Sequence, residues 1–370
     1  MRPGTTVISP SNVLEAITCD VKPGNAFEGG VTAEVFFCIS SVMRQFPPRR
    51  IVCLTEETVE TLYLLGEQDR IVGVSGYAVR PPQVRGEKPR VSAFISADIP
   101  KILALEPDLV LAFSDLQAEI VGDLVRAGVA IHVFNQRDVA GILAMIRTLG
   151  ALVGAAERAD QLATTYEKRL AQVASIARCS PKPKVYFEEW DDPLISGIGW
   201  VSELIEIAGG EDILPKLRFQ QAAKDRIILP DVVRAAAPDV ILASWCGKKV
   251  VADRIKKRPG WNEIPAVRDD RIVEIKSALI LQPGPAALTD GLDAIVAALW
   301  PADRVFSGCG AACTLHRVGD TITYSASTPH HSAMNSAVAL VDFRNDSIST
   351  YSLKPCIAAP LAPKHRLGML

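Results

Sequence analysis

The segment Ile102–Phe113, ILALEPDLVLAF, has a counterpart in Val233–Ser244, VRAAAPDVILAS. In each segment a helix-forming stretch reaches Pro-Asp and is followed by an apolar run that is typical of a buried strand. Proline ends the helix, aspartate holds the turn, and the strand then enters a sheet. The repeat therefore indicates two lobes of similar α/β build.

The residues around the first copy alternate between predicted strands and predicted helices. Strands are predicted over Arg50–Thr55, Arg70–Val74, Leu109–Phe113 and Ala130–Phe134, and helices over Glu56–Leu65, Ile99–Leu105 and Leu116–Ala127. Such alternation, with short loops, is the signature of a mostly parallel sheet.

The same alternation starts again after Pro183. Strands are predicted over Lys184–Phe187, Val240–Ser244 and Arg271–Ile275, and helices over Trp200–Ala208, Pro230–Ala236, Lys249–Lys257 and Ala286–Leu299. Between the lobes a helical stretch opens at Asp138 and runs to about Arg178, with Gly150 and Gly154 as points where it could bend or divide. Some 20 residues of helix span roughly 30 Å, which is enough to cross from one small domain to another.

The composition fits a globular protein of ordinary kind. The 370 residues suggest two or three domains, and the net charge of −2 gives no electrostatic footprint for nucleic acid. The eight cysteines are dispersed and do not resemble a disulfide framework. No stretch reaches the 18 to 20 apolar residues that a membrane span needs.

The first residues show no convincing secretory signal. Ser11–Thr18 is interrupted by Asn12 and Glu15, and the apolar run Val31–Val42 carries Glu34. An alternative is that translation begins at Met43, just before the first strong strand.

Five segments in this order resemble the solute-binding proteins for vitamin B12 and iron–siderophore complexes, and most of all the corrinoid binders. They are Arg50–Thr55, Ile71–Tyr77 (IVGVSGY), Pro89–Ser92, Leu105–Asp108 and Ala208–Asp212 (AGGED). The resemblance covers about Arg49–Leu299. It implies an α/β fold of the class III periplasmic-binding-protein type, in which two Rossmann-like lobes are bridged by a long rigid α-helix. The predicted organisation is an N-terminal extension (1–48), a first lobe (49–137), the bridging helix (138–180), a second lobe (181–300) and a C-terminal extension (301–370).

The resemblance also implies a cleft between the lobes that binds one small molecule, a corrinoid such as cobalamin or a related metal chelate. Open α/β sheets bind ligands at the carboxyl ends of their strands. Aromatic side chains offer apolar area with a polar edge to a large, partly flat ligand. The predicted ligand-binding residues at such strand ends are Tyr77, Phe94, Ser114, Asp115, Glu188, Glu189, Trp190, Trp200, Trp245 and Cys246.

Members of this family that feed a permease present a surface acid on each lobe. The second lobe keeps Asp231, whereas the first lobe places Pro100 at the matching helix start, where Asp98 could substitute. The resemblance implies a periplasmic, monomeric receptor for an ABC permease. The missing signal and Pro100 leave open a cytoplasmic protein that handles corrinoids without a permease, and a ferric-siderophore binder is a further alternative.

The sequence gives no convincing signal for a catalytic or metal site. The acidic residues Glu188, Glu189, Asp191 and Asp192 could serve acid–base catalysis, but we interpret them as an acidic cleft rim. His132 lies alone in an apolar strand, as expected of a core or rim histidine. We therefore predict no enzyme activity, no catalytic cofactor and no metal site.

Residues 301–370 do not continue the alternation of strands and helices that is predicted for the lobes. The set Cys309, Cys313, His316 and His330-His331 matches no zinc-finger spacing. We expect a hairpin of Ala337–Phe343 with Ser347–Leu353, followed by a disordered tail from Lys354.

Overall fold

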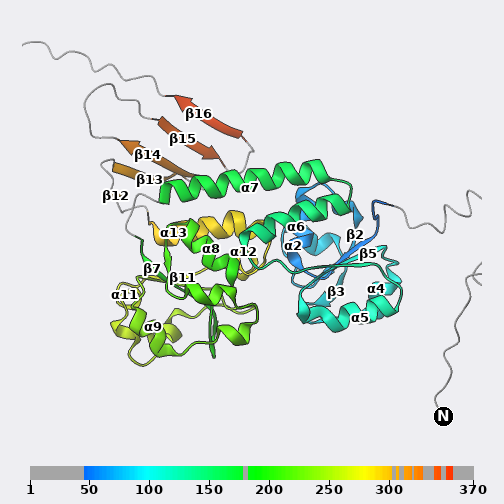
Figure 1. Cartoon of the computed structure of the whole chain (residues 1–370), viewed down its shortest axis with the longest axis horizontal. Helices are drawn as coiled ribbons and strands as arrows, with labels where there is room; N and C mark the ends of the chain where they lie inside the picture. The colour runs from blue at the N-terminus through cyan, green and yellow to red at the C-terminus, as the bar shows by residue number, and fades with distance from the viewer. Residues whose placement is uncertain are drawn as a thin grey trace, which may run out of the picture. The chain divides into compact units, whose positions relative to one another are not determined.

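The computed structural model describes residues 46–177 and 182–301, together with the backbone of strands at 306–307, 312–318, 321–327, 337–342 and 347–352. The elements of both lobes belong to one compact unit that begins at Phe46 (Figure 1).

The first sheet has the strand order β4-β3-β2-β1-β5-β6, and all its pairs are parallel except β3 with β4. Its strands are β1 (Ile51–Cys53), β2 (Ile71–Ser75), β3 (Arg90–Ala93), β4 (Ser96–Ala97), β5 (Leu109–Phe113) and β6 (Ile131–Phe134). The helical segments between them are α2 (Glu56–Leu64), η3 (Gln68–Arg70), α3 (Val84–Glu87), α4 (Ile99–Ala104), η4 (Asp115–Gln117) and α5 (Ala118–Arg126). The central strands β1 and β5 are wholly buried, as expected for a parallel sheet covered on both faces.

The second sheet has the order β11-β10-β7-β8, with β9 paired to β7. Its strands are β7 (Lys184–Asp191), β8 (Leu194–Ser196), β9 (Glu211–Asp212), β10 (Val240–Ala243) and β11 (Ile272–Glu274). The helical segments are α8 (Gly199–Ile207), η5 (Pro215–Phe219), η6 (Ala223–Arg226), α9 (Pro230–Ala236), α10 (Ala252–Lys256), η7 (Trp261–Glu263), α11 (Pro265–Arg268), α12 (Ser277–Ile280), η8 (Ala287–Gly291) and α13 (Leu292–Leu299). Strands β7, β9, β10 and β11 run parallel, and β8 turns back along β7.

The two Pro-Asp turns are built alike. The residue before each proline, Glu106 or Ala237, has a positive φ, of 46° and 49° respectively. The Asp108 carboxylate accepts hydrogen bonds from the backbone N–H groups at the start of β1, and the Asp239 carboxylate accepts one from Lys184 at the start of β7. Each aspartate thus ties its own turn to the amino end of the neighbouring strand, which confirms the internal repeat.

The predicted bridging stretch is a pair of helices. It divides at Val153–Ala155 into α6 (Val139–Leu152) and α7 (Ala156–Ala177). The helices touch where a Cβ on Gly150 would lie only 2.1 Å from that of Ala159, so the close approach requires glycine there.

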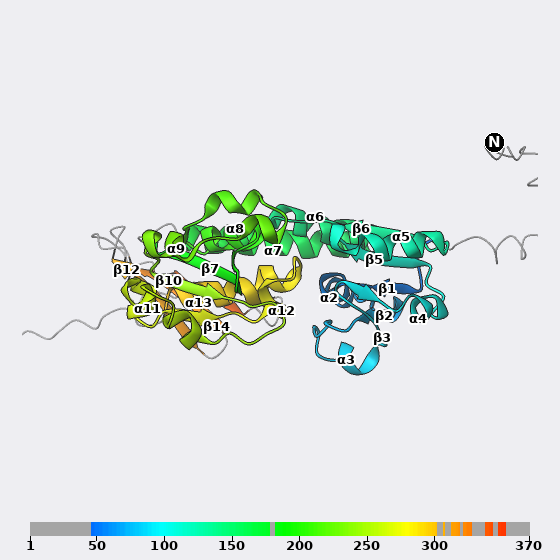
Figure 2. The ribbon, with the colours of Figure 1, turned by 90° about the horizontal axis from the view of Figure 1, so that it is seen from below.

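Helix α7 spans both lobes. Its first turn pairs with the first lobe through Arg158 and Glu67, and Arg169 further along pairs with Asp293 in the second lobe at 2.5 Å. Its 22 residues correspond to roughly 33 Å. Figures 1 and 2 show this helix passing both sheets. The α/β fold of two lobes bridged by a long helix is confirmed.

A third, antiparallel sheet follows in the order β12-β13-β14-β15-β16. Its strands are β12 (Phe306–Ser307), β13 (Ala312–Val318), β14 (Thr321–Ser327), β15 (Ala337–Asp342) and β16 (Ser347–Ser352). The pairing of β15 with β16 confirms the predicted hairpin strands. The cysteines and histidines from Cys309 to His331 and the tail from Lys354 lie outside the residues whose side chains are described. Among the described helices, none is both long and apolar enough to cross a membrane.

Candidate ligand-binding site

The two lobes meet where the strands of the first sheet end. Glu60, in the helix that follows β1, accepts a hydrogen bond from the Ala286 N–H at 3.0 Å, and the Gln136 side chain, after β6, donates to the Pro283 carbonyl at 2.9 Å. The partners Pro283 and Ala286 follow β11 of the second sheet. The carboxyl ends of both sheets therefore face a shared boundary, which is where open α/β sheets bind ligands.

Charged side chains of both lobes lie near this boundary. Arg137, after β6, lies over the Phe113 ring at 4.9 Å and pairs with Asp115 at 3.6 Å. Burial lowers the pKa of the Arg137 guanidinium, and the charges of Arg226 and Glu189 in the second lobe also act on it. Arg226 is buried and holds both Glu189 carboxylate oxygens, at 2.6 and 3.1 Å. The site is thus lined by nearly balanced charge.

Cys246 lies near acids of both lobes. The residue is exposed in the loop after β10, and partial desolvation of its thiol, together with the charges of Glu189 and Glu56, raises the pKa of the thiol. Glu56 belongs to the first lobe and directly follows β1 and Thr55. These charges from both lobes are consistent with a position of Cys246 near the boundary, and its role in ligand binding stays a prediction.

The predicted residues of the first lobe lie at strand ends but differ in exposure. Tyr77 is 55% exposed, and Asp115 is exposed beside Arg137. Phe94 is half-buried against the core, and Ser114 is buried, with its hydroxyl accepting from the Leu116 N–H. Tyr77 and Asp115 are accordingly the members of this set that are free to meet a ligand.

Two predicted tryptophans are core side chains. Trp200 is 2% exposed and its indole donates to the Ile280 carbonyl at 2.8 Å; Trp245 is 1% exposed and donates to Glu188 at 3.0 Å. The expectation that they stand on the cleft surface is corrected. A buried indole needs a hydrogen-bond partner, and both find it inside the second lobe.

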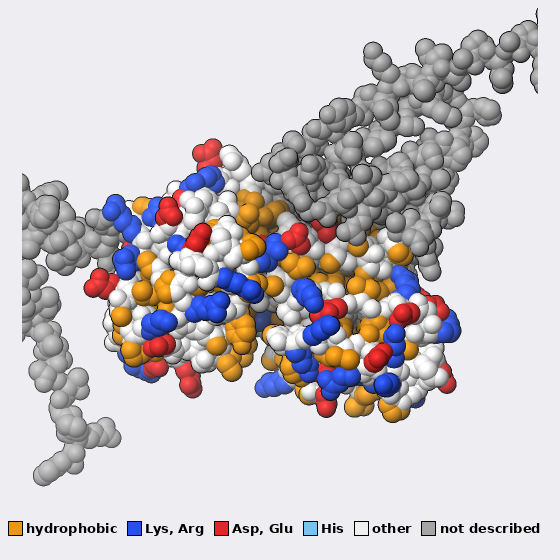
Figure 3. Space-filling model, turned by 180° about the vertical axis from the view of Figure 1, so that it is seen from behind, with side chains coloured by type: hydrophobic (Ala, Val, Ile, Leu, Met, Phe, Trp, Pro, Cys, Tyr) orange, Lys and Arg blue, Asp and Glu red, His pale blue; other side chains and the backbone are white. Residues whose placement is uncertain are grey.

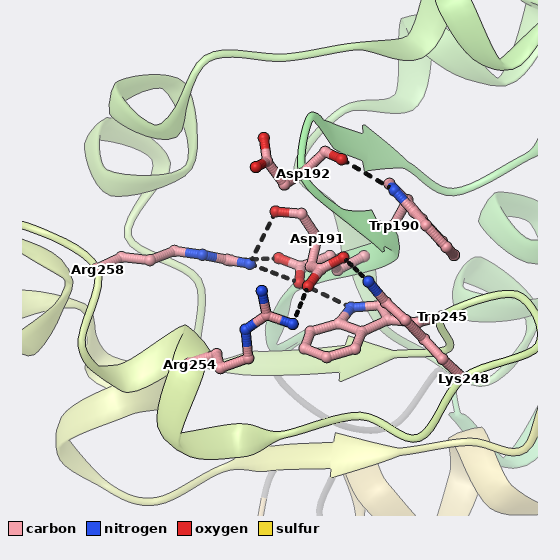
Figure 4. Close-up of polar contacts among 8 residues, drawn as sticks. Trp190, Asp191, Asp192, Trp245, Lys248, Arg254 and Arg258 are labelled. Carbon is pink, nitrogen blue, oxygen red and sulfur yellow. Dashed lines mark hydrogen bonds and ion pairs between the residues drawn. The ribbon is translucent and has the colours of Figure 1, made fainter.

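The acidic cluster is a salt-bridge network (Figure 4). Strand β7 continues through Asp191 instead of ending at Phe187, because β8 folds back and pairs with it. Glu188 is fully buried and receives two hydrogen bonds from Arg258, at 2.5 and 2.9 Å. Asp191 pairs with Lys248 at 2.5 Å and Arg254 at 2.9 Å. The prediction of an acidic rim that includes Glu188 is therefore wrong, since cations neutralise it.

Trp190 lies beside this network. Its indole donates to the Asp192 carbonyl at 3.0 Å, and the Lys248 ammonium stands 4.1 Å from the ring centroid (Figure 4). Trp190 is half-buried, so one part of the ring stays open to solvent. Of the three tryptophans predicted to bind ligand, Trp190 alone keeps this exposure.

The two predicted docking acids lie on the surface. Asp98 is exposed and caps α4 by accepting from the Lys101 N–H at 3.0 Å. Asp231 is exposed in the first turn of α9 and lies 3.3 Å from Arg234.

Several residues at the same strand ends were not predicted. Exposed apolar side chains in the loops after the strands are Ile95 and Leu116, and the charged side chains there are Glu56 and Arg137; exposed Phe219 and buried Arg226 end the short helices η5 and η6 of the second lobe. Figure 3 shows apolar and basic side chains on both sides of the notch between the lobes. The rule that located Tyr77, the position just after a strand, could have found Glu56 and Ile95 too.

The described residues show no cluster of side chains that could bind a metal ion. In the ranges 46–177 and 182–301, no group of three His, Cys, Asp or Glu side chains is arranged to hold one. His132 lies in β6 with its ring 4.3 Å from that of Phe134, and burial lowers its pKa.

Two parallel-sheet lobes, a spanning helix and a site at the facing strand ends define a class III solute-binding protein. The chain belongs to the periplasmic binding protein family, whose profile matches residues 51–279. Its relatives are named as a substrate-binding lipoprotein of an ABC transporter and as vitamin B12-binding or cobalamin-binding proteins, and none of these names is that of an enzyme.

Two relatives illustrate the match. An uncharacterized ABC transporter substrate-binding lipoprotein of Bacillus subtilis is 26% identical over 69% of this chain and 81% of its own length. A vitamin B12-binding protein of Vibrio parahaemolyticus is 24% identical over 68% of this chain and 90% of its own length.

Solved structures share the fold. A periplasmic heme-binding protein from a Roseiflexus species superposes with a TM-score of 0.59 and 27% identity, over 68% of this chain and 99% of its own. The periplasmic vitamin B12-binding protein of Vibrio cholerae gives a TM-score of 0.57 and 24% identity, over 69% and 98% of the two chains.

Proposed function

We propose that this chain binds a corrinoid of the cobalamin type between its lobes and delivers it, as a monomeric receptor, to an ABC permease. The observation that carries the proposal is the boundary itself, where Glu60 and Gln136 of the first lobe hydrogen-bond to the Pro283–Ala286 segment of the second. Relatives named vitamin B12-binding protein support the choice of ligand.

The composition of the site suits a large ligand of low charge. Exposed Tyr77, Ile95 and Leu116 supply apolar and aromatic area at the strand ends. The nearby charges are paired within the protein, as Arg226 with Glu189. A corrin ring carries a broad apolar face and neutral amide side chains, so it needs contact area and hydrogen bonds more than a cationic pocket.

Heme is the second candidate. Protein ligands to heme iron include tyrosine and cysteine thiolate, and Tyr77 and Cys246 are exposed at the boundary. Neighbours described as heme-binding share the fold. The anionic propionates of heme, however, would meet Glu56 and Glu189 as well as Arg137.

Calorimetric titration of the full chain with cyanocobalamin, dicyanocobinamide, hemin and a ferric hydroxamate siderophore tests the assignment. Both corrinoids should bind, and Tyr77→Ala should weaken them about tenfold, as for a partly buried aromatic contact. Val125→Ala, which shortens an exposed side chain on α5, serves as the control and should bind like the wild type. Binding of hemin or of the siderophore alone would reassign the ligand.

We also propose that Asp98 and Asp231 contact the permease, one from each lobe. Both are exposed at a helix start, where an arginine of a partner could reach them. Charge reversal of both residues should leave corrinoid affinity unchanged and abolish uptake in a permease reconstitution. Unimpaired uptake would remove them from the docking surface.

A further inference from the structure

Three glutamates open helix α2 at the boundary between the lobes, and their carboxyl groups are partnered differently. Glu57 accepts from the Thr55 hydroxyl at 2.6 Å, and Glu60 is held by Arg80 and the Ala286 N–H. Glu56 is only 6% exposed; its Oε1 accepts from the Ser75 hydroxyl at 3.2 Å, whereas its buried Oε2 has no hydrogen-bond partner in the protein.

The position of Glu56 links it to the ligand site. Glu56 follows β1 and Ser75 ends the neighbouring strand β2, so both stand at carboxyl ends of parallel strands. The Ser75 hydroxyl also accepts from the N–H of exposed Tyr77 at 3.2 Å. From the other lobe, Cys246 lies close enough for the Glu56 charge to raise the pKa of its thiol. The neighbours Glu57 and Glu60 contact Gly284 and Ala286 of the second lobe, so the unpartnered oxygen of Glu56 stands beside the boundary between the lobes.

A carboxylate oxygen is an acceptor only, so it recognises a donor. A buried acceptor without a partner destabilises the folded protein, and such groups are uncommon in native structures. The carboxyl groups of Glu57 and Glu60 both have hydrogen-bond partners, so the same part of α2 can supply partners to buried carboxyl groups. The unpartnered oxygen of Glu56 is consistent with a partner supplied by the ligand.

We propose that Glu56 is a specificity-determining residue whose free oxygen accepts a hydrogen bond from a carboxamide N–H of the bound ligand. This inference rests on the proposed function, because a corrinoid carries several such amides around its ring. Replacing the amide that reaches Glu56 with a carboxylate removes the donor and brings two negative charges together. The site should therefore reject that acid.

The test compares cyanocobalamin with its b-, d- and e-monocarboxylic acids by calorimetric titration of wild type, Glu56→Gln and Glu57→Gln. Wild type should bind at least one acid about tenfold or more weakly than cyanocobalamin, which matches the loss of one hydrogen bond to a charged group. Glu56→Gln should lose most of that discrimination, because the glutamine amide can donate to the acid. Glu57→Gln is the matched control, because Glu57 is also buried and lies one residue away, and it should keep the discrimination.

Each outcome decides one of the two proposals. Equal discrimination in wild type and Glu56→Gln, or no discrimination by the wild type against any of the acids, would overturn the role of Glu56 while leaving corrinoid binding intact. If neither cyanocobalamin nor any of its acids binds, the proposed function fails, and the role of Glu56 in recognising a corrinoid amide fails with it.

Discussion

Glu57 makes the stability of this protein depend on pH in an unusual direction. The side chain is 1% exposed in the first turn of α2. Burial, with the neighbouring Glu56 charge, raises the pKa of Glu57 from 4.5 to about 8. The carboxyl is therefore protonated in the folded protein at pH values where the unfolded chain ionises it.

The direction and the magnitude of this pH effect follow from the linkage between protonation and folding. Between pH 4.5 and pH 8 the folded state holds a proton at Glu57 that the unfolded state has released, so the free energy of unfolding falls as pH rises. At about 1.4 kcal/mol for each pH unit between the two pKa values, Glu57 lowers stability by up to about 5 kcal/mol at pH 8 and above. Most salt-bridged carboxyl groups have lowered pKa values, so they make the free energy of unfolding rise with pH instead.

Urea unfolding at half-unit steps from pH 5 to pH 8 measures this effect in wild type and Glu57→Gln. Glutamine mimics the protonated carboxyl and retains an oxygen that can accept from Thr55, so its gain over wild type should grow steadily with pH. The exposed Glu119→Gln on α5 should run parallel to wild type. If the Glu57→Gln curve also runs parallel over this range, Glu57 is not held protonated by burial and the reasoning fails.

Two further substitutions test the second lobe and the boundary. Arg258→Met leaves the buried Glu188 carboxylate without its counter-charge and should cost about 3–5 kcal/mol in urea unfolding. Arg258→Met combined with Glu188→Gln should recover most of that loss. Gly199→Ala would place a Cβ 2.2 Å from the Arg137 carbonyl oxygen, so it should lower stability by about 1–3 kcal/mol and weaken ligand binding; Gly86→Ala, with no atom within 4 Å, is the control.

The fold could be predicted because its signals are local. The two Pro-Asp segments contain the helix end, the turn and the strand, and the structure places Asp108 and Asp239 in the same role. Gly150 and Gly154 indicated that the bridging stretch could divide into two helices. The sequence did not indicate that these helices, α6 and α7, would pack against each other in antiparallel orientation. That pairing depends on contacts such as Arg147 with Asp160 and Glu167, which the periodicity of one helix does not reveal.

The site was predicted less well because exposure depends on tertiary contacts. Glu188, Trp190 and Trp200 all occupy positions near a strand end or helix start, yet only Trp190 keeps an open face. Trp200 is covered because the end of helix α12 lies over it, where the Ile280 carbonyl accepts its indole N–H. Glu188 is buried because Arg258, distant in sequence, supplies its counter-charge. Neither partner is adjacent in the chain, so residue type and position alone overestimated the aromatic and acidic surface.

The start of α2 shows how neighbouring residues of one type come to differ in function. Glu60 meets Arg80 and the second-lobe backbone, so it joins the lobes. Glu57 turns toward Thr55 and toward the Gly284 loop, where burial keeps it protonated. Glu56 points to Ser75 and retains one oxygen for a donor from outside the protein. A ligand amide can donate to Glu56 only if that oxygen carries no proton and has no other partner. The partners of Glu57 and Glu60 therefore matter as well, because they occupy these two carboxyl groups and leave Glu56 as the one that accepts from the ligand.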